Sequence, residues 1–250
     1  MDTETYAKIH AAEDTLWFYL GRREIVRRVI ETHGTLAVHR YLDVGCGSGG
    51  AMRELGREAG MIVGADVSPL ALRYSREKGL RHLFEGDAQE LPLAGESFEL
   101  VTALDVIEHC RDDVMALREI YRVLAPGGLC CLTVPALMVL WSNLDLVNRH
   151  FRRYTVSEVR RKAEQVGFCV RKASYANTWL FPGVLAVRLL QRFTQSPDDG
   201  AATLDFAMPS QGINRLMTLI FTSESNWLAR ANLPIGSSVI AVLQKPVVSE

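Results

Sequence analysis

The feature that most constrains this chain is a regular alternation of short apolar runs with segments of helical pattern, which starts at Arg40. This alternation is typical of an α/β protein, in which parallel strands are joined by crossover helices. We therefore expect seven strands, near residues 41–44, 61–65, 82–85, 98–103, 129–134, 168–175 and 237–243.

Helix-capping residues agree with this alternation. Ser68 stands at an N-cap, Pro69 at the first helical position and Gly79 just after the last turn of a helix that follows the second strand. Thr155 and Glu158 have the spacing of a capping box and predict the start of a later helix.

The length of 250 residues suits one large α/β domain with additional segments. Residues 1–38 are expected to form an N-terminal helical segment or lid, and residues 39–176 the core. Residues 177–235 are too many for a bare loop and contain helical patterns at 180–193 and 213–228, so we expect a helical insertion or cap there. Residues 236–250 would then supply the last strand.

Composition excludes several classes of protein. The chain has 28 Lys and Arg against 29 Asp and Glu, so no nucleic-acid partner is predicted. Its five cysteines form no CxxC pair, which favours reduced thiols and a cytoplasmic location. The first twenty residues do not resemble an export leader, and Pro182 and Gly183 interrupt the most apolar stretch, so no membrane span is expected.

A glycine-rich turn follows the first strand. Gly45, Gly47 and Gly50 allow the backbone to turn tightly and to approach a ligand, while the following helix offers free N–H groups. The same spacing occurs in dinucleotide-binding folds, so this turn alone leaves the nucleotide open.

Two carboxylates follow the next two strands. Asp66 ends the second strand, where an acidic side chain can bind the two hydroxyls of a ribose. Asp87 ends the third strand and is placed to accept from the amine of an adenine. Because ligands in such sheets bind outside the carboxyl ends of the strands, the sequence predicts one adenosine site along this edge.

Five ordered motifs resemble those of the class I S-adenosylmethionine-dependent methyltransferases, and in particular the bacterial UbiE/UbiG-like group (methyltransferase types 11 and 12). They are Leu42-Asp43-Val44-Gly45-Cys46-Gly47-Ser48-Gly49, Gly64-Ala65-Asp66-Val67-Ser68, Gly86-Asp87-Ala88, Ala103-Leu104-Asp105-Val106-Ile107-Glu108-His109 and Glu119-Ile120-Tyr121-Arg122-Val123-Leu124-Ala125-Pro126-Gly127-Gly128.

The resemblance implies a Rossmann-like, seven-stranded, doubly wound sheet whose last strand is antiparallel. It also implies S-adenosylmethionine as cofactor and S-adenosylhomocysteine as product. In such a protein Asp43 and the glycine turn would hold the methionine end, Asp66 the ribose, Asp87 with Ala88 the adenine, and Leu104 with Asp105 the region near the sulfur. The predicted cofactor-binding set is Asp43, Gly45, Cys46, Gly47, Asp66, Val67, Asp87, Ala88, Leu104 and Asp105.

Candidate residues that act on the methyl acceptor follow the fourth and fifth strands. His109 and His150 are predicted catalytic residues, since an oxygen acceptor must lose a proton. Alternatively, the His109 imidazole caps the strand-to-helix turn or bonds to the backbone. No metal site is predicted, because Glu108 and His109 alone do not make a ligand set.

A donor-rich stretch is the predicted acceptor-binding site. Arg152, Arg153 and Tyr154 suit a carboxylate, phosphate or sugar hydroxyl, with salt bridges to Asp145 or Glu158 as the alternative. Trp17 is a predicted lid residue, with packing in the core as its alternative.

The predicted function is transfer of a methyl group, by in-line displacement, to oxygen or nitrogen of a small molecule, sugar or lipid-linked metabolite. The alternatives are a non-catalytic cofactor-binding or partner-interaction protein and a nicotinamide-dependent oxidoreductase. The apolar insertion can pack on the core, form a homodimer interface or contact a membrane surface through residues 179–193.

Overall fold

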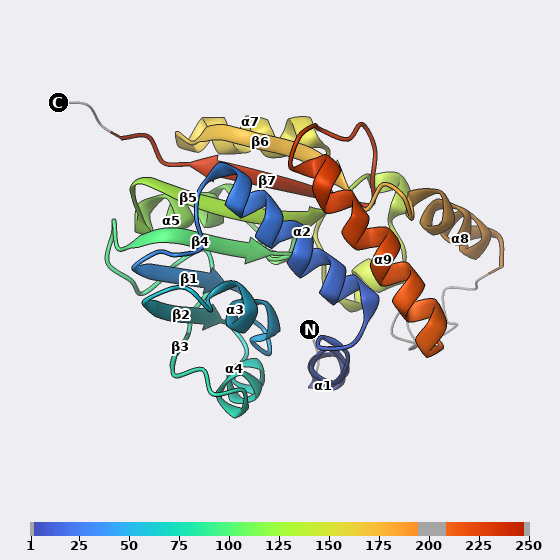
Figure 1. Ribbon diagram of the computed structural model, residues 1–250, viewed down its shortest axis with the longest axis horizontal. Helices are drawn as coiled ribbons and strands as arrows, with labels where there is room; N and C mark the ends of the chain where they lie inside the picture. The colour runs from blue at the N-terminus through green and yellow to red at the C-terminus, as the bar shows by residue number, and fades with distance from the viewer. Residues whose placement is uncertain (1–2, 195–208, 248–250) are drawn as a thin grey trace.

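The computed structural model describes residues 3–194 and 209–247. Parts of three expected segments, at 1–2, 195–208 and 248–250, lie outside the described residues. Seven strands form one sheet in the order β3-β2-β1-β4-β5-β7-β6 (Figure 1). The strands are β1 Arg40–Val44, β2 Met61–Asp66, β3 His82–Glu85, β4 Phe98–Leu104, β5 Leu124–Pro135, β6 Cys169–Ala176 and β7 Ser238–Gln244.

The direction of each strand confirms the predicted topology. Strands β1 to β5 pair in parallel, whereas β7 lies antiparallel between β5 and β6. The chain leaves β1 toward β2 and β3 and later returns to the other side of β1 with β4. The carboxyl ends of β1 and β4 therefore diverge at the point where ligands bind in open α/β sheets.

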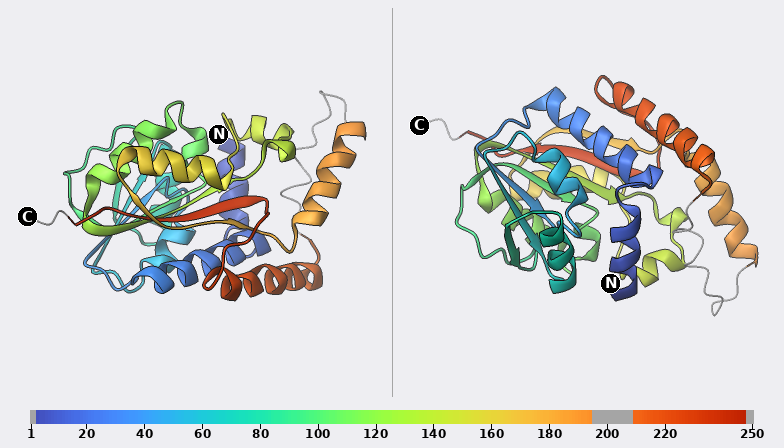
Figure 2. Two further views of the ribbon diagram at one scale, coloured as in Figure 1. Left: turned by 90° about the horizontal axis from the view of Figure 1, so that it is seen from above. Right: turned by 60° about the horizontal axis from the view of Figure 1, so that its bottom comes forward.

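Helices cover both faces of the sheet. The described α-helices are α1 Thr3–Ala12, α2 Trp17–His33, α3 Gly50–Leu55, α4 Pro69–Glu77, α5 Asp113–Val123, α6 Asn143–Val147, α7 Val156–Val166, α8 Phe181–Thr194 and α9 Gln211–Leu228. The described 3₁₀ turns are η1 Ile107–His109 and η2 Met138–Leu140. Two views of the fold show α7 on one side of the sheet and α2 with α9 on the other (Figure 2).

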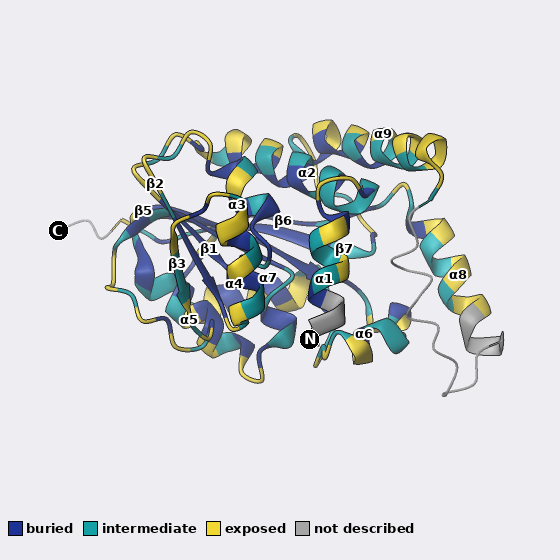
Figure 3. Ribbon diagram, turned by 90° about the horizontal axis from the view of Figure 1, so that it is seen from below, coloured by how far each residue is buried: buried dark blue, intermediate teal, exposed yellow. Residues whose placement is uncertain are grey.

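The core consists of two apolar layers because successive strand residues point to opposite faces. On β1, Leu42 packs with the α5 and α7 layer, and Tyr41 with the layer formed by α2, α3 and α9. Buried residues accordingly gather in the sheet and on the helix faces that cover it (Figure 3). Caps begin and end these helices as expected: Ser68 Oγ accepts from Ala71 N, and Gly167, at φ 112°, ends α7.

Candidate functional site

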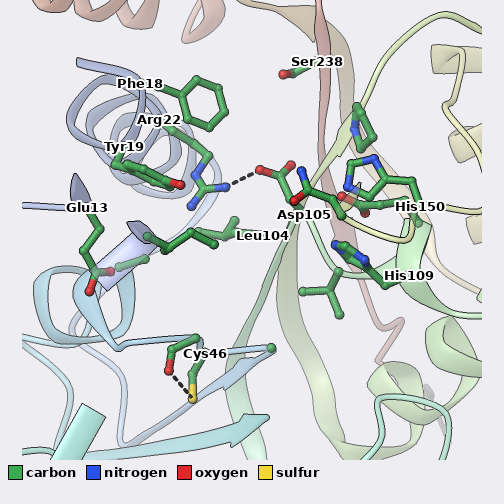
Figure 4. Close-up of a pocket in the computed structure, with 18 of the residues that line it drawn as sticks. Glu13, Phe18, Tyr19, Arg22, Cys46, Leu104, Asp105, His109, His150 and Ser238 are labelled. Atoms are coloured by element: carbon green, nitrogen blue, oxygen red, sulfur yellow. Dashed lines mark hydrogen bonds and ion pairs between the residues drawn. The ribbon is translucent and has the colours of Figure 1, made fainter. Parts of the chain in front are cut away.

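A pocket of about 690 Å³ lies at the carboxyl ends of β1 to β4. Residues of α1, α2 and the loop after α6 line it from the other side, so segments far apart in the sequence enclose it. Figure 4 shows this arrangement, with Phe18, Tyr19 and Arg22 opposite Asp105, His109 and His150.

The glycine turn contributes bare backbone to the pocket. Gly45 has φ 67°, and a Cβ there would collide with the Val106 side chain. Gly47 has φ 56°, and a Cβ there would meet nothing within 4 Å. The turn therefore packs tightly against the β4 end at Gly45 and leaves open space beside Gly47 for a ligand.

Asp66 is held by the same turn. Its two carboxylate oxygens accept N–H bonds from Gly47 (2.9 Å) and Ser68 (2.8 Å), and the Tyr6 hydroxyl also bonds to it. Burial raises the pKa of Asp66, while these bonds oppose the shift. A carboxylate has about four acceptor positions, so Asp66 can also accept from a hydroxyl of a ligand. On the next strand end, Asp87 is exposed and its neighbour Ala88 is buried.

Asp43 is a buried carboxylate beneath the glycine turn, with 3% of its surface exposed. Thr102 Oγ1 donates to it, and the Tyr41 hydroxyl lies 2.6 Å from the same Thr102 oxygen. Burial raises the pKa of Asp43 to about 7, against the opposing effects of the Thr102 hydrogen bond and the nearby Arg22 charge. A cation bound beside Asp43 would favour its ionised form.

Arg22 and Asp105 form an ion pair across the pocket. Asp105 has a positive φ of 57° and also accepts from Thr133 Oγ1 at 2.9 Å. The Arg22 guanidinium lies 5.5 Å from the ring centres of both Phe18 and Tyr19. This ion pair thus ties α2 to the end of β4 at the middle of the pocket.

A cluster of titratable side chains lies at the far end of the pocket, where the ring centres of His109 and His150 are 4.6 Å apart. His150 Nδ1 lies 2.8 Å from Asp145 Oδ1, and the Asn148 backbone bonds to His109. Burial, followed by repulsion from His150, lowers the pKa of His109 to about 4, so this imidazole is neutral near pH 7.

Glu108 belongs to the same cluster and is fully buried, and neither carboxylate oxygen has a hydrogen-bond partner among the described residues. Burial, followed by repulsion from Asp105, raises its pKa well above the ordinary value.

The structure separates the four residues predicted to bind the acceptor. Trp17 and Arg153 line the pocket, and Arg153 also binds Asp145 with two nitrogens, at 2.9 and 3.0 Å. Trp17 packs edge-on against Phe221, with ring centres 5.6 Å apart, so it belongs both to the core and to the pocket wall.

Arg152 and Tyr154 do not line the pocket, contrary to expectation. Asp113 engages both side chains: Arg152 lies 3.0 Å from it, and the buried Tyr154 hydroxyl donates to it at 2.7 Å. Arg152 also donates to the Arg111 carbonyl oxygen at 2.8 Å. We therefore leave Arg152 and Tyr154 out of the proposed acceptor site.

Comparison with known proteins relates the central part of this chain to methyltransferases. Residues 42–132 match the family described as a methyltransferase domain. A ubiquinone biosynthesis O-methyltransferase of Ruegeria pomeroyi is 35% identical over 116 residues, which cover 43% of this chain and 46% of that protein. A malonyl-[acyl-carrier protein] O-methyltransferase of Enterobacter lignolyticus is 31% identical over 113 residues, which cover 42% and 45%. The chain is therefore similar, over part of its length, to known methyltransferases.

Solved structures agree with this fold. The YcgJ protein of Bacillus subtilis aligns with a TM-score of 0.59 at 19% identity, covering 90% of this chain and 99% of that one. Phosphoethanolamine N-methyltransferase 2 of Haemonchus contortus aligns with a TM-score of 0.54 at 22% identity, covering 87% and 51%. By sequence, this chain spans about half the length of the two curated relatives described above.

All ten residues predicted to hold the cofactor line this pocket. Other residues that line it were given no role from the sequence, among them the polar residues Tyr6, Glu13, Arg22 and Glu108. Arg22 lies in an aromatic and arginine-rich segment, and this composition could have pointed to it. No sequence pattern indicates that Glu108 and His150 lie close together. Within the described residues, no helix combines the length and apolar character that a membrane crossing requires.

Proposed function

We propose that this chain binds S-adenosylmethionine in the pocket and transfers its methyl group to oxygen or nitrogen of a small molecule, sugar or lipid-linked metabolite. The observation that carries the proposal is the row of carboxylates Asp43, Asp66 and Asp87 at successive strand ends, all on one pocket of about 690 Å³. That volume is in the range of small-molecule sites. Two relatives named as O-methyltransferases favour an oxygen acceptor.

The residues present fit this cofactor. The open space beside Gly47 admits a ligand against the backbone, and the remaining acceptor position of Asp66 suits a ribose hydroxyl. Asp43 would face the methionine end, where a positive amino group offsets the cost of an ionised buried carboxylate.

The chain's part in the reaction is mainly to orient the reactants and to exclude water. When bound, S-adenosylmethionine supplies a methyl carbon activated by a positively charged sulfur. Aromatic side chains of α2, including Phe18 and Tyr19, cover the middle of the pocket and limit access of water. His109 is neutral near pH 7 and can accept a proton from an acceptor hydroxyl, and the His150 imidazole lies beside it.

The acceptor end combines apolar and cationic groups. Trp17, Leu144 and Phe151 line it together with Arg149 and Arg153. This combination supports an acceptor with an apolar body and a hydroxyl or anionic group.

Calorimetric titration with S-adenosylhomocysteine, and separately with NAD, tests the proposal. We expect saturable 1:1 binding of S-adenosylhomocysteine and none of NAD. Asp66→Ala should weaken that binding about 10- to 100-fold, since hydrogen bonds to a charged group contribute about 1.5–3 kcal/mol. Glu85→Ala is the matched control, because Glu85 is exposed at the end of β3 and does not line the pocket. Binding of NAD alone, or equal affinity in both variants, would contradict the proposal.

Transfer itself requires a second measurement. A panel of phenols, carboxylic acids, sugars and amines, incubated with the chain and S-adenosylmethionine, should yield a methylated product detectable by mass spectrometry. Cofactor binding without transfer to any member of the panel would instead favour a non-catalytic binding protein.

A further inference from the structure

Three potential metal ligands meet at the acceptor end of the pocket. Glu108 and His109 belong to η1, directly after β4, and His150 belongs to the loop after α6. Their ligand atoms all lie within 4.8 Å of one another, and all three residues line the pocket. Figure 4 shows His109 and His150 on the same side of the pocket, beyond Asp105.

Glu108 lacks the partners that a buried carboxylate normally has. It is 0% exposed, and neither oxygen accepts a hydrogen bond from the part of the chain that the structure describes. Burying an unpaired carboxylate is costly, so buried acidic groups are usually paired, hydrogen-bonded or bound to a metal ion. A cation between Glu108 and the two imidazoles would supply the missing partner.

Each of the two imidazoles makes a hydrogen bond with a neighbouring group, as histidine ligands do in metal sites. Asp145 lies 2.8 Å from His150 Nδ1, and Arg153 and the Ser142 N–H in turn hold Asp145. This contact leaves Nε2 of His150 for another partner. The backbone of Asn148 bonds to the His109 ring. A histidine ligand almost always makes such a bond with its second nitrogen, which fixes the orientation of the ring.

We propose that Glu108, His109 and His150 bind a single divalent transition-metal ion. Two imidazoles with one carboxylate suit Zn²⁺, Fe²⁺ or Co²⁺, whereas Mg²⁺ and Ca²⁺ prefer oxygen ligands. Three protein ligands leave at least one position open, as in catalytic sites.

The role of this ion, unlike the site itself, rests on the proposed function. An acceptor oxygen at the open position would be more acidic, because a bound metal ion lowers the pKa of its oxygen ligands. The two imidazoles would then act on the acceptor through the ion rather than as free bases.

Metal binding is tested on the full chain after treatment with a chelator. Zn²⁺ calorimetry and the visible absorption of Co²⁺ should report one ion per chain. His150→Ala and Glu108→Gln should each weaken this binding at least about 10-fold, as loss of a ligand or its support does in metal sites. His82→Ala is the matched control, because His82 is exposed on β3 and does not line the pocket.

Thermal unfolding gives a readout that does not depend on activity. Without metal, Glu108→Gln should melt at about the same temperature as the unmodified chain, because the amide keeps the size and shape of the buried side chain. With Zn²⁺, the unmodified chain should gain stability by mass action and Glu108→Gln should not.

Three results would overturn the site: no saturable binding to the unmodified chain, equal Zn²⁺ affinity in His150→Ala, or saturation by Mg²⁺ but not by Zn²⁺. Titration of the same metal-free chain with S-adenosylhomocysteine reports the proposed function separately. Nucleoside binding without metal binding refutes only the metal site, and the reverse result refutes only the proposed function.

Discussion

At the scale of single residues, Asp43 makes cofactor binding depend on pH. Its pKa is raised to about 7 by burial, so below that pH the free chain holds it mostly protonated. A positive amino group bound beside it favours the carboxylate, so binding below about pH 7 should release a proton, and affinity for S-adenosylhomocysteine should rise as the pH increases toward about 7 and level off above it. Calorimetry in buffers of different ionisation enthalpy measures both effects.

Asp43→Asn is the control for this prediction. The amide cannot ionise, so its weaker binding should change little over the same pH range. A pH dependence of equal size in Asp43→Asn would show that another group is responsible.

The Arg22–Asp105 ion pair is also testable at this scale. Asp105→Ala leaves the mostly buried Arg22 guanidinium without its counter-ion, and its Nε already lacks a partner. We expect the free energy of unfolding in urea to fall by about 1–3 kcal/mol. Adding Arg22→Met should recover part of this loss, because the two effects are coupled. Strictly additive effects would show that the two side chains do not stabilise each other.

The sequence predicts the cofactor half of the site better than the acceptor half. Asp43, Asp66 and Asp87 end successive strands, so the order of the strands alone brings them to one edge. Glu108 and His150 meet because two separate loops bend toward each other, which no local pattern records. Tyr154 looked accessible in a donor-rich stretch, but its ring is buried and its hydroxyl is bound to Asp113.

At the scale of elements, α2 and α9 depend on a close approach at Gly21. A Cβ on Gly21 would collide with the Phe221 ring of α9. We expect Gly21→Ala to lower the melting temperature, since overpacking costs about 1–3 kcal/mol and exceeds the helix gain of about 1 kcal/mol. Gly212→Ala is the control, because a Cβ on that exposed α9 residue meets nothing within 4 Å. An equal rise in both variants would contradict the predicted contact.

Element boundaries show where local patterns succeed and fail. The expected insertion helices at 180–193 and 213–228 correspond closely to α8 and α9, because caps and apolar spacing are local. Strand β5 begins at Leu124, earlier than the expected residue 129, because Leu124 pairs with Phe98 before the glycines produce a register shift. The five-residue helix α6 is too short for periodicity to detect, and Asp145 stabilises it through a capping box.

At the scale of the whole molecule, α1 should respond to the cofactor. Tyr6 and Ile9 of α1 line the pocket, and the following Glu13 accepts from Gly50 N and pairs with Lys78. We expect S-adenosylhomocysteine to slow hydrogen exchange in α1, because a bound nucleoside fixes the wall that covers it. Helix α7 does not line the pocket and is the internal control. Unchanged exchange in α1 at saturating ligand would show that this helix does not cover the nucleoside.

The position of β7 affects how the chain folds during synthesis. A ribosome completes β6 before the insertion and makes β7 only after it, yet β6 pairs with β7 and with no other strand of the described sheet. Until β7 emerges, a nascent chain therefore carries a strand without a partner and an open edge on β5, both of which invite aggregation. Translation that pauses within the insertion should make this nascent polypeptide a target for chaperones.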